Sequence, residues 1–280
     1  AKGYFAEEGL DAIAQPHAFG KPALAAVIEG RADIATVGDT PIVFAVMNGE
    51  KITTLAAIQT SNRNEAIVAR RDLGITTPAD LKGKKIGVPF GTTAHFFVDS
   101  FLLAQGLEKA KVTLVDMKPD DMAAAFDSGR IDAVSTFNPS LKRLEKGLGM
   151  NGAVFYGESL YTETFCVAAK QEYARKNPEA VKKFLWALIK AETFIKKHDK
   201  EAQAIVADFI KIDKAVLEEI WDILSFRVTL DQALLVDFED QTRWLLKNKL
   251  STGTRMPNYL EYIYSEGLHA VKPVAVRLVR

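Results

Sequence analysis

The chain has 280 residues, which is long enough for two packed lobes or one large domain, and its composition excludes several classes of protein. It carries 36 basic and 36 acidic side chains, so a net charge of zero provides no long-range field for nucleic acid or for an anionic membrane surface. Its single cysteine, Cys166, falls in a predicted strand. With only one cysteine, the chain can form neither an intrachain disulfide nor a cysteine metal cluster. One cysteine is compatible with the cytosol and with the periplasm.

The first sixty residues alternate between short apolar runs and helical stretches. The start already has the pattern of helix interior, and we expect an export signal or a first strand to come before it. The expected elements are a helix over residues 1–10, strands over 13–16, 33–37 and 53–58, and a helix over 21–28 that stops before Gly30. This alternation predicts α/β layers.

A polar cluster, Gln59, Thr60 and Ser61, follows the strand that is expected to end at Ile58. Ligands of open α/β sheets bind at the carboxyl ends of strands, which favours a binding role for this loop. Arg63 either supplies a charge there or points into solvent. The alternative for the whole cluster is an ordinary solvated loop.

Residues 84–97, KKIGVPFGTTAHFF, predict a strand at 86–88 that is followed by a helix beginning after Gly91. The start of a helix has unpaired N–H groups and the positive end of the dipole, which together favour an anion. Thr92 and Thr93 would add hydroxyl donors. The alternative is that one threonine only caps the helix.

Two distant segments share a sequence pattern, which we call the internal echo. Residues 25–37 and 124–136 each predict a helix that stops at glycine, a Gly-Arg-X-Asp turn and a strand. If the echo is real, each lobe carries one copy, and the segments just past the two strands, 38–41 and 137–139, correspond to each other. Two such loops facing each other would form a cleft. The alternative is coincidence, because helix, glycine, charged turn and strand form a common connection.

The sequence lacks the motifs of nucleotide, zinc and serine-hydrolase sites. No lysine follows Gly91 as a P-loop requires, and residues 147–152 fit G-x-G-x-x-G but follow a helix-like stretch and precede a strand-like one. The four histidines show no zinc-ligand spacing. His95 lies one turn into the predicted helix, where it either donates to a ligand or fills the wall of a groove. We expect no metal, no cofactor and no catalysis.

The pattern changes after about residue 177 to almost continuous amphipathic helix. Asn177 with the proline that follows it, Asp213 and Asp231 are each placed to begin a helix. The aromatic residues of this half are expected in the core. Its apolar runs are far shorter than the roughly 20 residues that span a bilayer.

Four stretches, in order along nearly the whole chain, together resemble the solute-binding proteins of ABC importers for aliphatic sulfonates, taurine, nitrate and thiamine-pyrimidine precursors. They are KGYFAEEGLD (2–11), GRADIATVGDTP (30–41), DLKGKKIGVPFGTTAHFF (80–97) and SGRIDAVSTFNP (128–139). Their combination is much more specific than any one of them.

The resemblance implies a type II periplasmic-binding-protein fold, in which two α/β lobes are joined by a hinge and enclose a ligand cleft. Lobe I would comprise residues 1–82 and 165–280 without its first strand, and lobe II residues 83–164. The crossing strands would lie near 66–70 and 164–168.

The resemblance also implies which residues contact the ligand. Many family members carry an acid before the proline of the 137–139 turn, where this chain has Asn138, and this disfavours a ligand with a cationic amine. The implied contacts lie on two loops of lobe I and on the helix start and turn of lobe II: Asp39, Thr40, Gln59, Thr60, Ser61, Gly91, Thr92, Thr93, His95 and Asn138.

The implied function is capture of a small anionic solute, such as an aliphatic sulfonate or nitrate, for delivery to the membrane permease of an ABC transporter. The protein would be monomeric and either periplasmic or an extracytoplasmic lipoprotein. Two alternatives stay open: a ligand-sensing domain of a signalling protein, and a thiamine-pyrimidine-precursor binding protein or synthase-like enzyme. The fungal synthases of similar fold carry a cysteine-rich segment, which this chain lacks.

Overall fold

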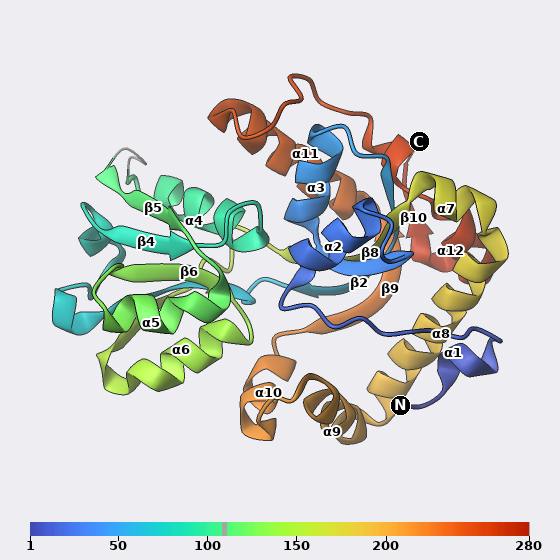
Figure 1. The fold of residues 1–280 in the computed structure, drawn as a ribbon, viewed down its shortest axis with the longest axis horizontal. Coiled ribbons are helices and arrows are strands. Elements are labelled where there is room, and N and C mark those ends of the chain that lie inside the picture. Colours follow the sequence, from blue (N-terminus) through green and yellow to red (C-terminus); the bar gives the residue numbers. More distant parts are fainter. Residues whose placement is uncertain (108–110, 280) are drawn as a thin grey trace. The chain divides into compact units, whose positions relative to one another are not determined.

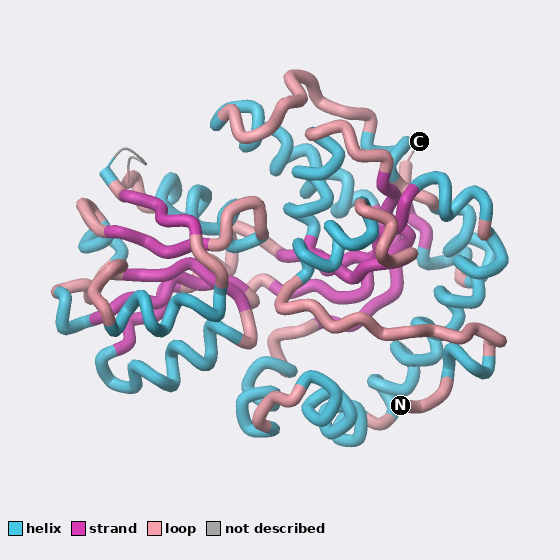
Figure 2. Tube along the Cα trace, in the orientation of Figure 1, coloured by secondary structure: helices cyan, strands magenta, loops and turns pink. Residues whose placement is uncertain are grey.

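The computed structural model describes residues 1–107 and 111–279, which form two compact units. Unit 1 comprises Ala1–Thr60, Thr164–Ile210 and Ser225–Arg280, and unit 2 comprises Ser61–Glu163 and Lys211–Leu224. The predicted lobe boundaries stay a prediction, and the compact units differ from them at residues 61–82 and 211–224. Each unit contains one five-stranded sheet with helices packed on it (Figures 1 and 2).

The sheet of unit 1 has the strand order β1-β8-β2-β9-β10. β1 pairs antiparallel with β8, β2 pairs antiparallel with β9, and β9 pairs parallel with β10. Cys166 lies in β8, as predicted, and is buried. The strands are β1 (Ile34–Gly38), β2 (Ile52–Ser61), β8 (Glu163–Lys170), β9 (Ser225–Asp231) and β10 (Val276–Arg277).

The helices of unit 1 bury the apolar faces of this sheet in one continuous core. α11 packs on α3, and α12 packs on α8. They are α1 (Tyr4–Glu7), α2 (Gly20–Ile28), α3 (Asp39–Met47), α7 (Gln171–Lys176), α8 (Pro178–Lys197), α9 (Asp199–Ile210), α11 (Gln232–Asn248) and α12 (Ser265–Val271), with short 3₁₀ turns η6 (Tyr259–Tyr262) and η7 (Pro273–Ala275).

The sheet of unit 2 has the strand order β5-β4-β6-β3-β7. β4 is parallel to both β5 and β6, whereas β3 is antiparallel to β6 and β7. The strands are β3 (Glu65–Arg70), β4 (Lys85–Val88), β5 (Thr113–Asp116), β6 (Ala133–Phe137) and β7 (Gly152–Phe155). Residues 66–70, where the resemblance places a crossing strand, pair on both sides within this sheet, and the crossing itself stays a prediction.

Alternate residues of β3 enter two separate cores, because successive side chains of a strand point to opposite faces. Ile67 and Ala69 pack under α4, whereas Ala66 and Val68 pack under α5 and α6. Figure 1 shows these helices on opposite sides of the sheet. The helices of unit 2 are α4 (Thr93–Ala104), α5 (Met122–Asp127), α6 (Ser140–Leu148) and α10 (Lys214–Trp221), with 3₁₀ turns η1 (Arg71–Leu73), η2 (Pro78–Leu81), η4 (Pro119–Asp121) and η5 (Gly149–Asn151).

The internal echo has the same geometry in both copies. α2 ends at Ile28 and α5 ends at Asp127. Gly30 and Gly129 each follow two residues later, and both have positive φ, +77° and +67°. The residue after each glycine donates its N–H to a carbonyl five residues earlier, at 2.8 Å for Arg31 and 3.0 Å for Arg130. Glycine is favoured at such a left-handed helix end because it has no Cβ. The two copies lie in different units, as the echo predicts.

Several sequence predictions need correction. Residues 13–16 form no strand, and Ile13 is 83% exposed. Without a partner strand, an extended segment has neither ladder hydrogen bonds nor a buried face to stabilise it. The first helix is limited to Tyr4–Glu7, since Gly3 and Gly9 on either side both have positive φ. Asp213 caps α10 as predicted, whereas Asp231 makes no side-chain cap to α11. Trp186 is 42% exposed rather than in the core.

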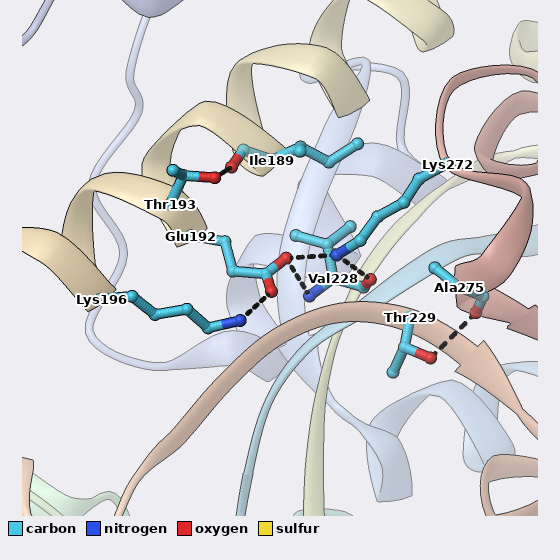
Figure 3. A network of polar contacts seen from close by, with 8 residues as sticks. All are labelled: Ile189, Glu192, Thr193, Lys196, Val228, Thr229, Lys272 and Ala275. Atoms are coloured by element: carbon cyan, nitrogen blue, oxygen red, sulfur yellow. Dashed lines mark hydrogen bonds and ion pairs between the residues drawn. The ribbon is translucent and has the colours of Figure 1, made fainter.

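A buried carboxylate joins α8 to β9 and α12 in unit 1 (Figure 3). Glu192 Oε2 accepts hydrogen bonds from Lys272 Nζ at 2.7 Å and from the Val228 N–H at 3.1 Å, and its other oxygen pairs with Lys196. Burial opposes the charged form of Glu192, but these three donors outweigh it and hold the pKa of Glu192 below its usual value. Glu192 is only 7% exposed, so the network stabilises the packing of three elements.

Candidate functional site

The turn between β4 and α4 in unit 2 is built by a glycine. β4 ends at Val88, and Gly91 has a φ of +72°, a left-handed conformation that redirects the chain at little cost for glycine. Thr92 then has extended backbone as the N-cap residue, and α4 runs from Thr93 to Ala104. The prediction of a strand, a glycine turn and a helix in this segment is confirmed.

The start of α4 presents hydrogen-bond donors. The N–H groups of Thr92, Thr93 and Ala94 have no acceptor among the residues that the structure describes. The Thr92 hydroxyl donates to the Pro89 carbonyl at 2.6 Å and therefore holds the turn. The Thr93 hydroxyl has no partner in the described part of the chain. With the positive end of the helix dipole, these groups can bind an anion without a basic side chain.

His95 supports the turn from within the helix. The Gly91 N–H donates to His95 Nδ1 at 3.2 Å, and the imidazole stacks on Phe90 with ring centroids 4.5 Å apart. Because Nδ1 accepts this bond, the ring proton of the neutral imidazole lies on Nε2. The Gly91 N–H is thus used inside the turn, and a contact of Gly91 with ligand stays a prediction.

Asn138 follows the carboxyl end of β6, at the same edge of the sheet as the β4 turn, because β4 and β6 are parallel. Its backbone N–H donates to the Asn64 carbonyl at 3.1 Å. Neither its side-chain Oδ1 nor its Nδ2 has a partner in the described residues, although both atoms are buried. The Ser135 hydroxyl donates to the Ala94 carbonyl at 2.9 Å and fixes β6 against the start of α4. A buried amide without partners indicates a place for a ligand or water.

Buried acids also lie in unit 2. Glu65 is opposite Phe137 in the β3–β6 ladder and is 3% exposed. Glu163, also 3% exposed, accepts a hydrogen bond from Asn64 Nδ2 at 2.7 Å. The Asn64 side chain and main chain therefore connect Glu163 to Asn138.

Asp39 and Thr40 begin α3 in unit 1 and are fully buried. Asp39 Oδ1 accepts from the Thr40 N–H at 2.6 Å, and Oδ2 accepts from the Thr164 N–H at 2.9 Å. The Thr40 hydroxyl also bonds Asp39 Oδ1, at 3.3 Å. The carboxylate thus fastens the start of α3 to β8, a structural role that the sequence did not predict.

Asp237 of α11 lies close enough to Asp39 for their charges to repel each other. Burial, together with the charges of Asp39, Asp240 and Asp231, raises the pKa of Asp237 to about 7. A hydrogen bond from the Thr164 side chain opposes this rise only in part.

The predicted polar loop after Ile58 is a strand. β2 continues to Ser61, with Gln59 opposite Phe226 and Thr60 opposite Ser225 of β9, so these residues belong to a ladder. This pairing with a segment far along the chain explains the difference from the sequence prediction. Gln59 and Thr60 are half-buried, and Ser61 is buried.

Arg63 is held at the surface of unit 2. Its guanidinium pairs with Glu158 at 3.1 Å and lies 4.9 Å from the centroid of the Tyr156 ring. These contacts answer the open question about this charge, because an arginine that already pairs with an acid has less to offer an anion.

The structure brings the predicted residues together in two groups, one in each unit. Thr92, Thr93, His95 and Asn138 meet at one sheet edge of unit 2, whereas Asp39 and Thr40 lie in unit 1. Sequence reasoning missed Thr164, which bonds to Asp39, and Asp237, which senses the charge of Asp39; both come near Asp39 only in the folded chain and belong to no sequence motif. The described residues hold no cluster of His, Cys, Asp or Glu suited to a metal, and none of their helices is long and apolar enough to cross a membrane.

The family model described as "NMT1/THI5 like" matches residues 1–202. This chain belongs to that family. It is 30% identical over 220 residues to a binding protein of Brucella abortus (strain 2308), covering 78% of this chain and 67% of that protein. It is 27% identical over 250 residues to a protein of Bacillus subtilis (strain 168) named for binding aliphatic sulfonates, covering 85% of this chain and 74% of the relative.

Among solved structures, the periplasmic aliphatic sulphonate binding protein SsuA from Escherichia coli superposes with a TM-score of 0.74. The two share 21% sequence identity, and the match covers 88% of this chain and 84% of SsuA. At this identity the likeness concerns the fold. The predicted periplasmic-binding-protein fold is thereby confirmed, and the named relatives are binding proteins.

Proposed function

We propose that this protein is the solute-binding component of an ABC importer and acts outside the cytoplasm as a monomer without a cofactor. It captures a small anionic solute of the aliphatic sulfonate class and delivers it to a membrane permease. Family membership supports the transport role, and the names of the relatives support capture rather than catalysis.

The observation that carries this proposal is the set of unpaired donors in unit 2. The N–H groups of Thr92, Thr93 and Ala94, the Thr93 hydroxyl and the Asn138 amide offer several hydrogen bonds at a helix start. A sulfonate is fully ionised at neutral pH and accepts several hydrogen bonds at once. Neutral donors stabilise such an anion and still allow its release, whereas a buried countercharge would hold it more tightly.

The proposal assigns the ligand contacts of unit 2 to Thr92, Thr93, His95 and Asn138, with Gly91 shaping the turn. In unit 1 it assigns them to Thr40, Gln59 and Thr60, with Ser61 following along β2. Asp39 acts by positioning the start of α3 through the Thr40 and Thr164 amides.

Isothermal titration with alkanesulfonates, nitrate, bicarbonate and pyrimidines tests the proposal. We expect an alkanesulfonate to bind, and at a hundredfold excess over Kd it should add about 2.7 kcal/mol to the free energy of unfolding. Thr93→Ala should weaken binding by roughly tenfold or more, the loss typical of one hydrogen bond to a charged group. Asn138→Leu should weaken binding without lowering stability, because it removes an unsatisfied buried amide.

The matched control is Thr113→Ala, which changes an exposed threonine of β5 in the same unit. It should leave affinity unchanged. If no anion of the panel binds, or if Thr93→Ala and Asn138→Leu bind like the wild type, the proposal is wrong. Binding of a pyrimidine alone would instead favour the precursor-binding alternative.

A further inference from the structure

The Asn138 amide of unit 2 has no hydrogen bond that fixes its direction. Its Oδ1 and Nδ2 atoms are buried and have no partner in the part of the chain that the structure describes. The direction of the side chain therefore depends on packing and on the backbone at residue 138. The Asn138 N–H donates to the Asn64 carbonyl at 3.1 Å, which continues the β3–β6 ladder by one residue beyond the pair of Glu65 and Phe137. Asn64 thus holds the backbone from which the amide projects.

Asn64 is held in turn by Glu163. The Asn64 Nδ2 donates to Glu163 Oε2 at 2.7 Å, and the two residues are only 8% and 3% exposed. A carboxyl oxygen is a strong acceptor, and burial keeps water from competing for the bond. Asn64 is therefore bonded on two sides, through its side chain to Glu163 and through its carbonyl to Asn138.

This bond joins the two segments by which the chain enters and leaves the main part of unit 2. The chain enters at Ser61, three residues before Asn64, and it leaves at Glu163, 99 residues after Asn64. The next residue, Thr164, belongs to unit 1 and donates its N–H to Asp39 Oδ2 at 2.9 Å. Glu163 thus fixes one of these segments to the other at a point where the fold of unit 2 ends.

We propose that Glu163 is a positioning residue for ligand binding, which acts through Asn64 to hold the Asn138 amide in place. The carboxyl group fixes the Asn64 side chain, and the Asn64 carbonyl fixes the backbone of Asn138. A preorganised amide loses less freedom when the anion binds, so the affinity is higher. The inference rests on the proposed function and adds to it a residue that need not touch the ligand.

Titration calorimetry with ethanesulfonate tests this role. Glu163→Ala removes the acceptor of Asn64 and should weaken binding roughly fivefold to tenfold. Asn64→Ala keeps the carbonyl but removes the donor, so it should cause a similar loss. Glu163→Gln keeps an oxygen that accepts from Asn64 and should restore binding to within about twofold of the wild type. In an Asn138→Leu background, Glu163→Ala should cause no further loss, because the residue through which Glu163 acts is gone.

The matched control is Asn62→Ala. Asn62 lies two residues before Asn64, is exposed, and donates its Nδ2 to the Glu158 carbonyl at 3.2 Å. Because this bond leads to no proposed ligand contact, the control should keep the affinity within about twofold.

Three results would overturn the positioning role and leave the proposed function intact. The first is wild-type affinity in both Glu163→Ala and Asn64→Ala. The second is a loss from Glu163→Ala that is as large in the Asn138→Leu background as in the wild type, which is the result of a purely structural role. The third is a Glu163→Gln variant that binds as weakly as Glu163→Ala. Absence of binding by the wild type to every anion of the panel overturns the proposed function and the positioning role together.

Discussion

Two acidic side chains of unit 1 show opposite solutions to the burial of a carboxyl group. Glu192 lies among two lysines and a backbone amide, and its pKa is lowered. Asp237 lies near three other aspartates, and its pKa is raised to about 7. Burial favours the neutral acid in both places, so the difference comes from the neighbours.

The difference separates an acid whose charge is compensated by its neighbours from an acid whose charge its neighbours oppose. Glu192 has its charge compensated within the fold and can contribute little to a ligand. Asp237 stores unfavourable repulsion that an added cation would relieve.

The largest effect is expected from Glu192→Gln. The change removes the charge while keeping the shape and leaves Lys272 with fewer acceptors, so we expect a loss of about 2–3 kcal/mol in unfolding free energy at pH 7. Because the folded-state pKa of Glu192 is lowered, its stabilisation is present above the unfolded-state pKa and is lost as the pH falls through the folded value.

Urea denaturation at several pH values measures this effect. The gap between wild type and variant should close in acid. Glu179→Gln is the control, since Glu179 is exposed and pairs with Lys182, three residues later in the same helix. A loss no larger than in this control would show that the network of Figure 3 is unimportant for stability.

Asp237→Asn should raise the free energy of unfolding, the opposite of the effect of Glu192→Gln. The folded-state pKa is raised, so the folded protein binds more protons than the unfolded chain, and stability falls as the pH rises through about 7. Asparagine removes this loss. We expect the variant to be more stable than the wild type by roughly 2 kcal/mol at pH 8, allowing for the partial exposure of the carboxyl group, and equal to it near pH 4.

Thermal unfolding at pH 4, 6 and 8 compares the two proteins. If the variant is less stable than the wild type at pH 8, then the Asp237 carboxylate is paired rather than repelled, and the contrast with Glu192 disappears.

The smallest effect is expected from Lys196→Met. Lys196 pairs with Glu192 but its side chain is 60% exposed, so solvent and salt screen most of the interaction. We expect a loss of about 0.5 kcal/mol or less, and a smaller one at 1 M salt. Lys272→Met should cost more, because the Lys272 side chain is only 25% exposed. Equal losses for the two lysines in denaturation experiments would contradict the view that burial sets the strength of each pair.

The predictions that succeeded rest on local patterns. The β4 turn at Gly91, the helix from Thr93 and the two glycine stops at Gly30 and Gly129 depend on residues that are neighbours in sequence. The placement of Asn138 beside the start of α4 followed from parallel strands. Such features can be read from spacing and from the conformational freedom of glycine.

The features that were missed depend on distant segments. Gln59 and Thr60 continue a strand because β9, more than 160 residues later, pairs with them. Asp237 fits the spacing of an ordinary amphipathic helix, and only the packing of α11 on α3 brings it near Asp39. Which face of α11 is buried can be identified only from the folded structure.

The order of segments along the chain has a consequence for biosynthesis. Unit 2 is opened at Ser61 and completed by residues 211–224, where Glu219 of α10 pairs with Lys146 of α6 at 2.9 Å. Unit 1 begins before Ser61 and needs β9 and α11, which are made still later. A nascent chain leaving the ribosome can therefore finish unit 2 while unit 1 still lacks β9 and β10, the last two strands at one end of its sheet. Vectorial synthesis thus favours folding of unit 2 first.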